Sequence, residues 1–221
     1  MKILLLGANG KMGKIVQEYC VNHNIDTICV DPTFTKIQKQ QLDTDCKNVD
    51  VVLDFSNADA LSDNLDFCLK NNLPYVVATT NHSKQNLKKI NKAKDYIAIF
   101  FSPNFSFGFN LFLQAIKNLN RKIFDVAIIE QHHKSKKDNP SGSAKQIAKV
   151  MEDREDLQIF GIRGGTEIGS HTVLFFSENE KIEITHTAQN RIVFAHGAIC
   201  ACQFLQDKSK GLYSMKDLVD Q

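Results

Sequence analysis

The sequence predicts an α/β fold in which a doubly wound parallel sheet is joined to a smaller α+β domain. Over about the first hundred residues, short apolar runs alternate with polar stretches of helical spacing, a pattern typical of strand-helix-strand units. After residue 101 the pattern changes to a helix followed by several strands. The length of 221 residues suits one large domain or two small ones.

In the first half, we expect the apolar runs to be buried parallel strands. They are Ile3–Leu6, Thr27–Val30, Val51–Phe55, Tyr75–Ala78 and Ile97–Phe101. Apolar residues at helical spacing predict helices over 11–22, 58–70 and 83–93. The segment 32–47 is polar and short, so it is either a reduced helix or a loop.

In the second half, we expect helices over 111–119 and 143–151 and strands over 125–130, 157–162, 171–176 and 181–186. Residues 192–205 are apolar and compatible with a helix, and residues 211–219 form a tail. We therefore expect one domain made of residues 1–105 and 192–221, and a second made of residues 106–191.

Composition excludes several classes of protein. A hydrophobic content of 43%, with 11 Gly and 4 Pro, is typical of a globular chain and not of a disordered or collagen-like one. The net charge of +2 is too small for nucleic acid to be the main partner. No apolar run approaches the roughly 20 residues of a membrane span, so we expect no membrane association and a cytoplasmic location. The six cysteines contain no CxxC pair, and we expect them to be reduced packing residues.

A glycine-containing turn follows the first predicted strand and opens the first helix. It consists of Gly7, Ala8, Asn9, Gly10, Lys11, Met12 and Gly13. Glycines let the backbone turn tightly and approach a pyrophosphate, whose charge the helix N-terminus stabilises. Asp31 ends the second predicted strand eighteen residues beyond Gly13, where a carboxylate can accept a hydrogen bond from a ribose hydroxyl. The pattern predicts Rossmann-type dinucleotide binding; the alternative is a simple tight turn beside an exposed Asp.

Asp31 also predicts which dinucleotide is preferred. Its carboxylate would repel a 2′-phosphate. The next residue is Pro32, so no Arg stands there to bind such a phosphate. We therefore expect NADH as the preferred cofactor and NADPH as the alternative. Lys11 and Lys36 are the residues that would offset this preference by capturing the extra phosphate.

A second candidate site lies in the predicted α+β domain. Residues 130–137 close a strand and carry His132, His133 and Lys136. A His and a Lys four residues apart on a loop can supply a proton and a fixed positive charge. Gly142 and Ser143 then open a helix, where backbone N–H groups can bind a carboxylate. This combination is typical of reduction of an acidic substrate.

From spacing alone, simpler interpretations of this stretch remain open. The stretch 132–137 is compatible with a solvated basic surface, or the paired His with a metal site, although no carboxylate or Cys is spaced to complete a zinc set. Ser141 or Ser143 is compatible with a simple helix cap. We expect Arg163 to Thr166 to be a turn, and His171 and His186 to be strand residues with satisfied ring nitrogens. The group His196, Cys200 and Cys202 is expected to pack in the core.

Six motifs together resemble the 4-hydroxy-tetrahydrodipicolinate reductase (dihydrodipicolinate reductase) family. They are Gly7 to Gly13, Ala78-Thr79-Thr80, Pro103-Asn104-Phe105-Ser106, Glu130-Gln131-His132-His133-Lys134-Ser135-Lys136, Pro140-Ser141-Gly142-Ser143 and Glu183-Ile184-Thr185-His186. The resemblance runs from Ile3 to about Val219. Glu-x-His-His-x-x-Lys followed by Pro-Ser-Gly is specific to the family, so it outweighs the glycine turn.

The resemblance implies an oxidoreductase of lysine and diaminopimelate biosynthesis. A hydride would pass from a reduced nicotinamide to C4 of a cyclic dicarboxylate imine, giving tetrahydrodipicolinate with loss of water. By matching positions, His132 would be the general acid and Lys136 a second proton donor. His133, Gly142 and Ser143 would contact the substrate. Gly7, Ala8, Asn9, Gly10, Lys11, Met12 and Asp31 would bind the adenosine and pyrophosphate half of the cofactor, and Ala78, Thr79, Thr80, Ser102, Pro103, Asn104 and Phe105 would line the nicotinamide.

The resemblance also has consequences for assembly and includes departures from the family pattern. It implies a homotetramer formed through the sheet of the second domain, and domain closure about hinges near residues 104–107 and 191.

Ala78 replaces the usual glycine before Thr-Thr, and Ser143 replaces the usual Thr. The chain is shorter than typical members, with the missing length around the second crossover and in loops of the second domain.

Two other functions remain alternatives to this reductase. One is a different nicotinamide-dependent dehydrogenase of a small acidic substrate, built on the same two-domain plan. The other is a non-catalytic module that senses NADH. A substrate screen separates the first from the reductase, and turnover with any substrate excludes the second.

Overall fold

The computed structural model describes residues 1–31, 48–151, 154 and 157–221, and its contacts divide the chain into two compact units. The first unit consists of Met1–Phe105 and Phe194–Gln221, and the second of Ser106–Val193. The expected second crossover, with Pro32, Lys36 and Cys46, lies outside the described residues. Of the helices in the described part of the chain, none is both long and apolar enough to span a membrane.

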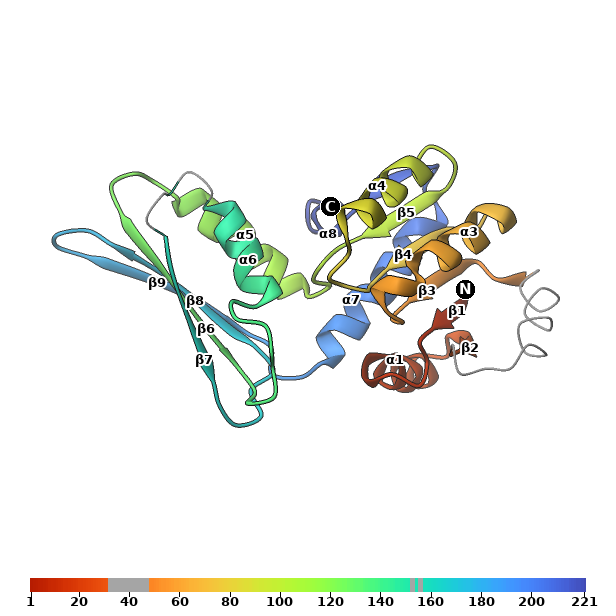
Figure 1. Ribbon diagram of the computed structural model, residues 1–221, viewed down its shortest axis with the longest axis horizontal. Coiled ribbons are helices and arrows are strands. Elements are labelled where there is room, and N and C mark those ends of the chain that lie inside the picture. The colour runs from red at the N-terminus through yellow and green to blue at the C-terminus, as the bar shows by residue number, and fades with distance from the viewer. Residues whose placement is uncertain (32–47, 152–153, 155–156) are drawn as a thin grey trace. The chain divides into compact units, whose positions relative to one another are not determined.

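The first unit is built on a parallel sheet, which the described residues show as six strands (Figure 1). The strands are β1 (Lys2–Leu6), β2 (Asp26–Val30), β3 (Val51–Asp54), β4 (Tyr75–Val77), β5 (Ala98–Phe101) and β10 (Gly211–Tyr213). Their order in space is β10-β5-β4-β3-β1-β2. The order reverses between β1 and β3, which is the signature of a doubly wound sheet, and the predicted fold of this half is confirmed.

Among the described helices of this unit, all but the one in the tail lie close to where the apolar spacing predicts them. They are α1 (Lys11–Asn22), α3 (Leu61–Asn71), α4 (Lys84–Ala93), α7 (Ile192–Gln206) and α8 (Met215–Val219). The helix expected over 58–70 begins as a separate 3-10 turn, η2 (Ala58–Ala60). The side chain of Asn57 accepts from the N–H groups of Asp59 and Ala60, so the chain tightens there before α3 starts.

Two expectations for this sheet need correction. We expected the second apolar run to be a buried strand, but β2 is half-buried because it lies at an edge of the described sheet. The tail over 211–219 contains a further strand, β10, which pairs in parallel with β5. Strands β3 and β4, by contrast, are buried throughout and form the centre of the core.

The second unit is a mixed sheet covered on one face by two helices (Figure 1). Its strands are β6 (Asp125–His132), β7 (Gln158–Arg163), β8 (Ser170–Phe176) and β9 (Lys181–Thr187), in the order β7-β6-β8-β9. Only the pair β6 and β7 is parallel among the described strands of this sheet. The helices are α5 (Phe107–Leu119) and α6 (Gly142–Val150), whose apolar faces pack on alternate residues of the strands. The expected α+β domain is therefore confirmed.

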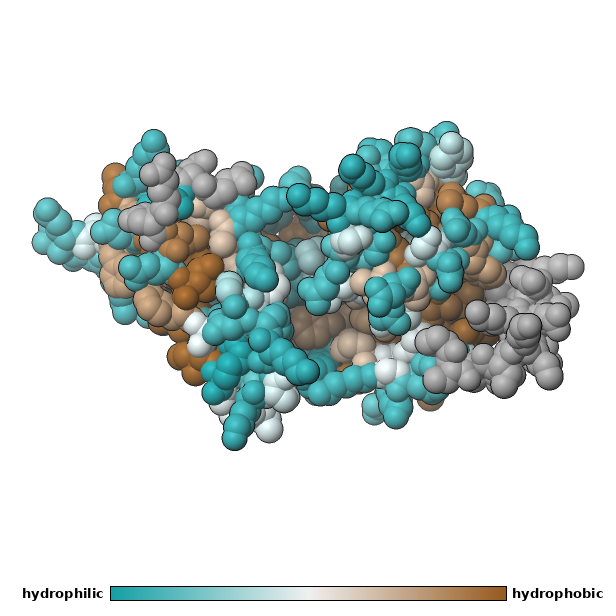
Figure 2. Space-filling view, in the orientation of Figure 1, coloured by the Kyte–Doolittle hydropathy of each residue, from teal (hydrophilic) through white to brown (hydrophobic). Residues whose placement is uncertain are grey.

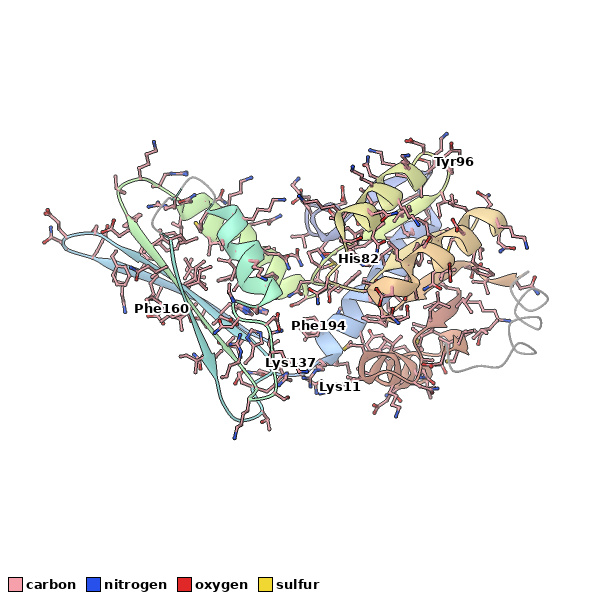
Figure 3. The ribbon with its side chains drawn as sticks, viewed as in Figure 1. Lys11, His82, Tyr96, Lys137, Phe160 and Phe194 are labelled. Atoms are coloured by element: carbon pink, nitrogen blue, oxygen red, sulfur yellow. The ribbon has the colours of Figure 1, made fainter. Side chains whose placement is uncertain are left out.

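The other face of this sheet exposes large apolar side chains. Along β7, Ile159 packs in the core with α5 and α6, so the alternating residues Phe160 and Ile162 point to the opposite face. Phe160 is 52% exposed and Ile162 51% exposed, and Phe176 on β8 is 37% exposed. Figure 2 shows hydrophobic atoms at the surface of this unit, and Figure 3 labels Phe160.

Candidate functional site

The first candidate site lies at the carboxyl edge of the parallel sheet, where the strand order reverses between β1 and β3. In doubly wound sheets, ligands bind outside the carboxyl ends of the strands at this point. The turn after β1 is anchored to β2, because Gly7 and Ala8 both donate to the Val30 carbonyl. The segment after β3 lies directly beside this turn, since a Cβ built on Gly7 would be 2.6 Å from the Ser56 nitrogen.

Two glycines of the turn are required by geometry. Gly7 has φ +78°, in the left-handed region that L side chains rarely adopt. A Cβ on Gly13 would approach the backbone of Ala8 to 2.6 Å, which no backbone tolerates without moving. The turn and the first turn of α1 therefore pack as closely as the predicted pyrophosphate-binding motif requires.

The N-terminus of α1 has the electrostatics that an anion needs. Its N-cap is Gly10, and among the described residues no side chain makes a capping hydrogen bond there and no acidic residue occupies the first turn. By contrast, α4, α5 and α6 are each capped by a Ser side chain. Lys11, labelled in Figure 3, is the first residue of α1 and adds positive charge.

Asp31 lies beside this turn at the end of β2. Its side chain is 8% exposed, and Oδ2 accepts a hydrogen bond from the Asn9 N–H at 3.1 Å. The structure thus brings Asp31 together with the turn that the sequence predicted as its partner. Pro32 and Lys36, which also entered the argument on cofactor preference, lie outside the described residues.

The remaining predicted cofactor residues follow β4 and β5 at the same edge of the sheet. Ala78 donates to the Asp54 carbonyl. Thr79 is buried, and its Oγ1 lies 2.9 Å from Nε2 of His82, which is labelled in Figure 3. Thr80 is exposed. After β5, the Ser102 Oγ donates to the Asn104 carbonyl, and the Phe105 ring packs against the Phe100 ring. Pro103, between them, is exposed.

Sequence reasoning missed a buried carboxylate next to this edge. Asp54 is fully buried at the end of β3 and accepts from Ser56, Asn64 and Tyr75, the last at 2.5 Å. Burial, followed by the charge of Asp54, raises the pKa of Tyr75 well above its ordinary value. A polar residue that ends an otherwise apolar run is the sequence signal that would have identified Asp54. Its network fixes the Phe55–Ser56 backbone beside Gly7.

The second candidate site begins at the end of β6. His132 is the last residue of this strand and is 6% exposed, so it does not lie on a loop as expected. Its Nδ1 lies 2.5 Å from Oε2 of Glu130, which is fully buried two residues earlier on the same face of the strand. Burial lowers the pKa of His132, and the positive charges of Lys136 and Arg163 lower it further. The Glu130 carboxylate raises this pKa but does not cancel the other effects, so the pKa lies below its ordinary value.

Arg163 has a larger part in this site than the turn we expected over residues 163–166. It ends β7, and its Nη2 donates to Glu130 Oε1 at 2.8 Å and to the Asp138 carbonyl at 2.6 Å. Glu130 Oε1 also accepts from the Ser141 N–H at 3.0 Å. Burial raises the pKa of Glu130, but the hydrogen bonds from Arg163 and Ser141 outweigh it and hold the carboxyl below its ordinary pKa. The turn itself follows, with Gly165 at φ +51°.

Lys136 and the N-terminus of α6 are brought together by one carboxylate. Lys136 Nζ lies 2.8 Å from Asp138 Oδ1, and the Gly142 N–H donates to Asp138 Oδ2 at 3.3 Å. Ser143 is the next residue of the helix, and Ser141 is its cap, with a side-chain oxygen that accepts from the Ala144 N–H. Burial raises the pKa of Asp138, and Lys136 outweighs this and lowers it. The His133 ring turns to Ser135, 2.8 Å away.

Two further histidines line the buried side of this site. His171 on β8 packs edge-on against His132, with ring centroids 5.1 Å apart, and burial lowers its pKa to about 3. The expectation that His171 and His186 have satisfied ring nitrogens is wrong for one nitrogen of each, because their Nδ1 atoms are buried with no hydrogen-bond partner among the described residues. Burial likewise lowers the pKa of His186.

Glu130, His132 and His171 also offer possible metal-ligand atoms within 4.8 Å of one another. The 2.5 Å between Glu130 Oε2 and His132 Nδ1 is an ion-pair distance, and neither atom has another polar partner among the described residues. Two ligands of one zinc ion, each about 2.0 Å from the metal, would stand farther apart in a tetrahedral site. Arg163 already balances the charge of Glu130, so we assign this group to proton chemistry.

A pocket of about 290 Å³ opens beside His132. Its walls are Gln131 and His132 from β6, Ile162 from β7 and the turn over residues 164–167. The second unit therefore combines an imidazole held by a carboxylate, a lysine, a helix N-terminus and an open pocket, which can bind an anion and donate a proton to it. The described cysteines form no disulfide with one another, and Cys20, Cys68 and Cys202 are buried.

Comparison with known proteins agrees with this geometry. A family model described as "Dihydrodipicolinate reductase, N-terminus" matches residues 1–105, and one described as "Dihydrodipicolinate reductase, C-terminus" matches residues 108–219. The 4-hydroxy-tetrahydrodipicolinate reductase of Clostridium novyi is 36% identical over 248 residues, covering 99% of this chain and 98% of the relative. That of Caldanaerobacter subterraneus is 36% identical over 251 residues, with the same coverage of each.

A solved structure shares the whole fold. The dipicolinate-bound dihydrodipicolinate reductase from Paenisporosarcina sp. TG-14 superposes with a TM-score of 0.79 at 21% identity, covering 97% of each chain. Together with the two family models and the relatives at 36% identity, this likeness leads to one conclusion. The chain belongs to the dihydrodipicolinate reductase family.

Proposed function

We propose that the protein is a 4-hydroxy-tetrahydrodipicolinate reductase, which reduces its substrate to tetrahydrodipicolinate with loss of water. The observation that carries the proposal is the second site, where His132, Lys136 and the N-terminus of α6 present an acid beside two groups suited to a carboxylate. Membership of the reductase family supports the same reaction. The step belongs to lysine and diaminopimelate biosynthesis.

We assign cofactor binding to the first unit, at the turn from Gly7 to Met12 and at Asp31. A reduced nicotinamide, when bound, supplies the hydride. The tight approach at Gly13 and the uncapped N-terminus of α1 suit a pyrophosphate, and the segments 78–80 and 102–105 at the same sheet edge suit the nicotinamide half. Asp31 favours NADH over NADPH, because its carboxylate accepts from a ribose hydroxyl and repels a 2′-phosphate.

We assign substrate binding and proton transfer to the second unit. Gly142 and Ser143 hold one carboxylate through the helix N-terminus, and Lys136 holds negative charge beside it. His133 contacts the substrate. His132 donates the proton that balances the hydride, because electron density builds on the ring as the hydride arrives. Lys136 is the second candidate for proton donation.

We also propose that the exposed face of the four-stranded sheet is where copies of this chain associate, as a homotetramer. Phe160, Ile162 and Phe176 lie on that face with more than a third of their surface exposed. Exposed apolar side chains on one face are typical of association surfaces. We propose a small-molecule partner and a cytoplasmic location, and neither a nucleic acid nor a membrane partner.

The reaction is tested by following nicotinamide oxidation with substrate generated in situ from pyruvate and aspartate semialdehyde by the preceding synthase, with NADH and NADPH in parallel. We expect turnover with both and preference for NADH. His132→Gln should lower kcat by roughly 100- to 10,000-fold without weakening NADH binding. His23→Gln, an exposed histidine of the first unit, is the matched control. NADH binding without turnover, together with oxidation of an amino acid, would favour a different dehydrogenase.

A further inference from the structure

We propose that Glu130 is a positioning residue of this reaction: it holds the His132 ring by Nδ1, so that Nε2 delivers the proton to the substrate. The inference rests on the proposed function, since it concerns the acid of that reaction. Neither the sequence expectations nor the family comparison gives Glu130 a role. It acts through His132 and does not itself touch the substrate.

The two oxygens of the Glu130 carboxylate do different things. Oε1 accepts the Ser141 N–H at 3.0 Å and the Arg163 guanidinium at 2.8 Å, which ties β6 to α6 and β7. Oε2 has no such partner among the described residues and faces His132 Nδ1 at 2.5 Å. A purely structural brace would need only Oε1. The second oxygen is therefore committed to the imidazole.

The position of the histidine follows from the strand. Glu130 and His132 are two residues apart on β6, so their side chains leave the same face of the sheet. With Nδ1 turned to the carboxylate, Nε2 is the nitrogen that remains for the substrate. The space beside Nε2 is kept open by Gly169, where a Cβ would lie 3.1 Å from that atom.

Four other titratable or charged groups face the Glu130–His132 pair, directly or through His171. They influence whether His132 is protonated. Arg163 on β7 and Lys136 on the following loop are cationic and oppose protonation of His132. His171 on β8, with His186 behind it on β9, stays neutral because burial lowers the pKa of His171 to about 3. The charge of Glu130 raises the pKa of His132 against these groups, so it is what allows His132 to carry the proton that it donates.

These charges predict the direction in which the pH profile of kcat/KM shifts in each variant. An acid that must be protonated loses activity as pH rises through its pKa, so His132 controls the basic limb of kcat/KM. Glu130→Gln removes the charge that raises the pKa of His132, and the basic limb should move to lower pH. Arg163→Gln removes a charge that lowers this pKa, and the limb should move to higher pH. A merely structural role would not produce opposite shifts.

The experiment compares these variants in the full-length enzyme. We expect Glu130→Gln to lower kcat at least tenfold, within the roughly 100- to 10,000-fold that a positioned acid contributes, with little change in substrate KM. The matched control is Glu178→Gln, an exposed glutamate in the turn between β8 and β9; it should leave kcat and the pH profile unchanged. Wild-type kcat and an unshifted limb in Glu130→Gln would overturn the proposal.

A second measurement on the wild-type enzyme requires neither a Glu130 variant nor turnover. Nitrogen-15 NMR of the histidine rings, with His132 assigned by its loss in His132→Gln, reports which nitrogen holds the proton in the neutral form. We expect Nδ1–H. The Nε2–H tautomer would refute the pairing with Glu130. Absence of turnover in the wild-type enzyme would refute the proposed function instead, so the two failures are distinguishable.

Discussion

Asp31→Asn tests whether one carboxylate determines the cofactor preference. The side chain is 8% exposed and fixed by the Asn9 N–H at 3.1 Å, so its orientation beside the glycine turn is defined before any ligand binds. Asparagine keeps an oxygen for Asn9 but loses the charge. A hydrogen bond to a charged group contributes about 1.5–3 kcal/mol, which corresponds to a roughly 10- to 100-fold weaker Kd for NADH. NADPH should bind equally well or better, because repulsion of its 2′-phosphate is relieved.

The assay is fluorescence titration of NADH and of NADPH, at one fixed salt concentration because phosphate contacts are screened by salt. Asp26→Asn is the matched control, since Asp26 is exposed at the opposite end of the same strand. The ratio of the two Kd values should change in Asp31→Asn and remain constant in Asp26→Asn. An unchanged ratio in Asp31→Asn would show that the preference comes from elsewhere and would refute this reasoning.

Tyr75→Phe removes the donor that lies 2.5 Å from the buried Asp54 carboxylate, so we expect a loss of about 2 kcal/mol and a Tm lower by about 4–8 °C in a thermal scan. Tyr213→Phe, whose hydroxyl donates to an exposed carbonyl, should shift Tm by far less, and equal shifts would contradict the prediction. Asp138→Asn should free Lys136 and the Gly142 N–H for the substrate and lower its KM by up to about fivefold, the upper range for a partly exposed pair. A raised KM in steady-state kinetics would instead make Asp138 a support for Lys136.

The order of strands and helices could be predicted because each element carries its own periodicity. The buried runs at 51–53 and 75–77 are apolar, as expected of strands covered on both faces. By contrast, β10 has only three residues, and nothing local distinguishes it from a tail. It is a strand because β5 offers it a free edge, which is a property of the tertiary structure.

The candidate site divides in the same way. Gly7, Gly13 and Asp31 could be predicted because their roles depend on short-range backbone geometry. Arg163 could not, because its partner Glu130 lies thirty-three residues away on a neighbouring strand. The register of β6 against β7, which pairs His132 with Arg163, brings these charges together, and no local pattern encodes it.

The return of the chain to the first unit has a consequence for synthesis on the ribosome. The second unit is inserted between β5 and α7, so residues 1–105 emerge long before the residues that complete their sheet. Until α7 and β10 arrive, the edge of β5 has no partner on that side and Phe100 lacks the contact with Phe204. Exposed strand edges and apolar side chains promote aggregation. The nascent first half is therefore the stage at which this protein most needs a chaperone.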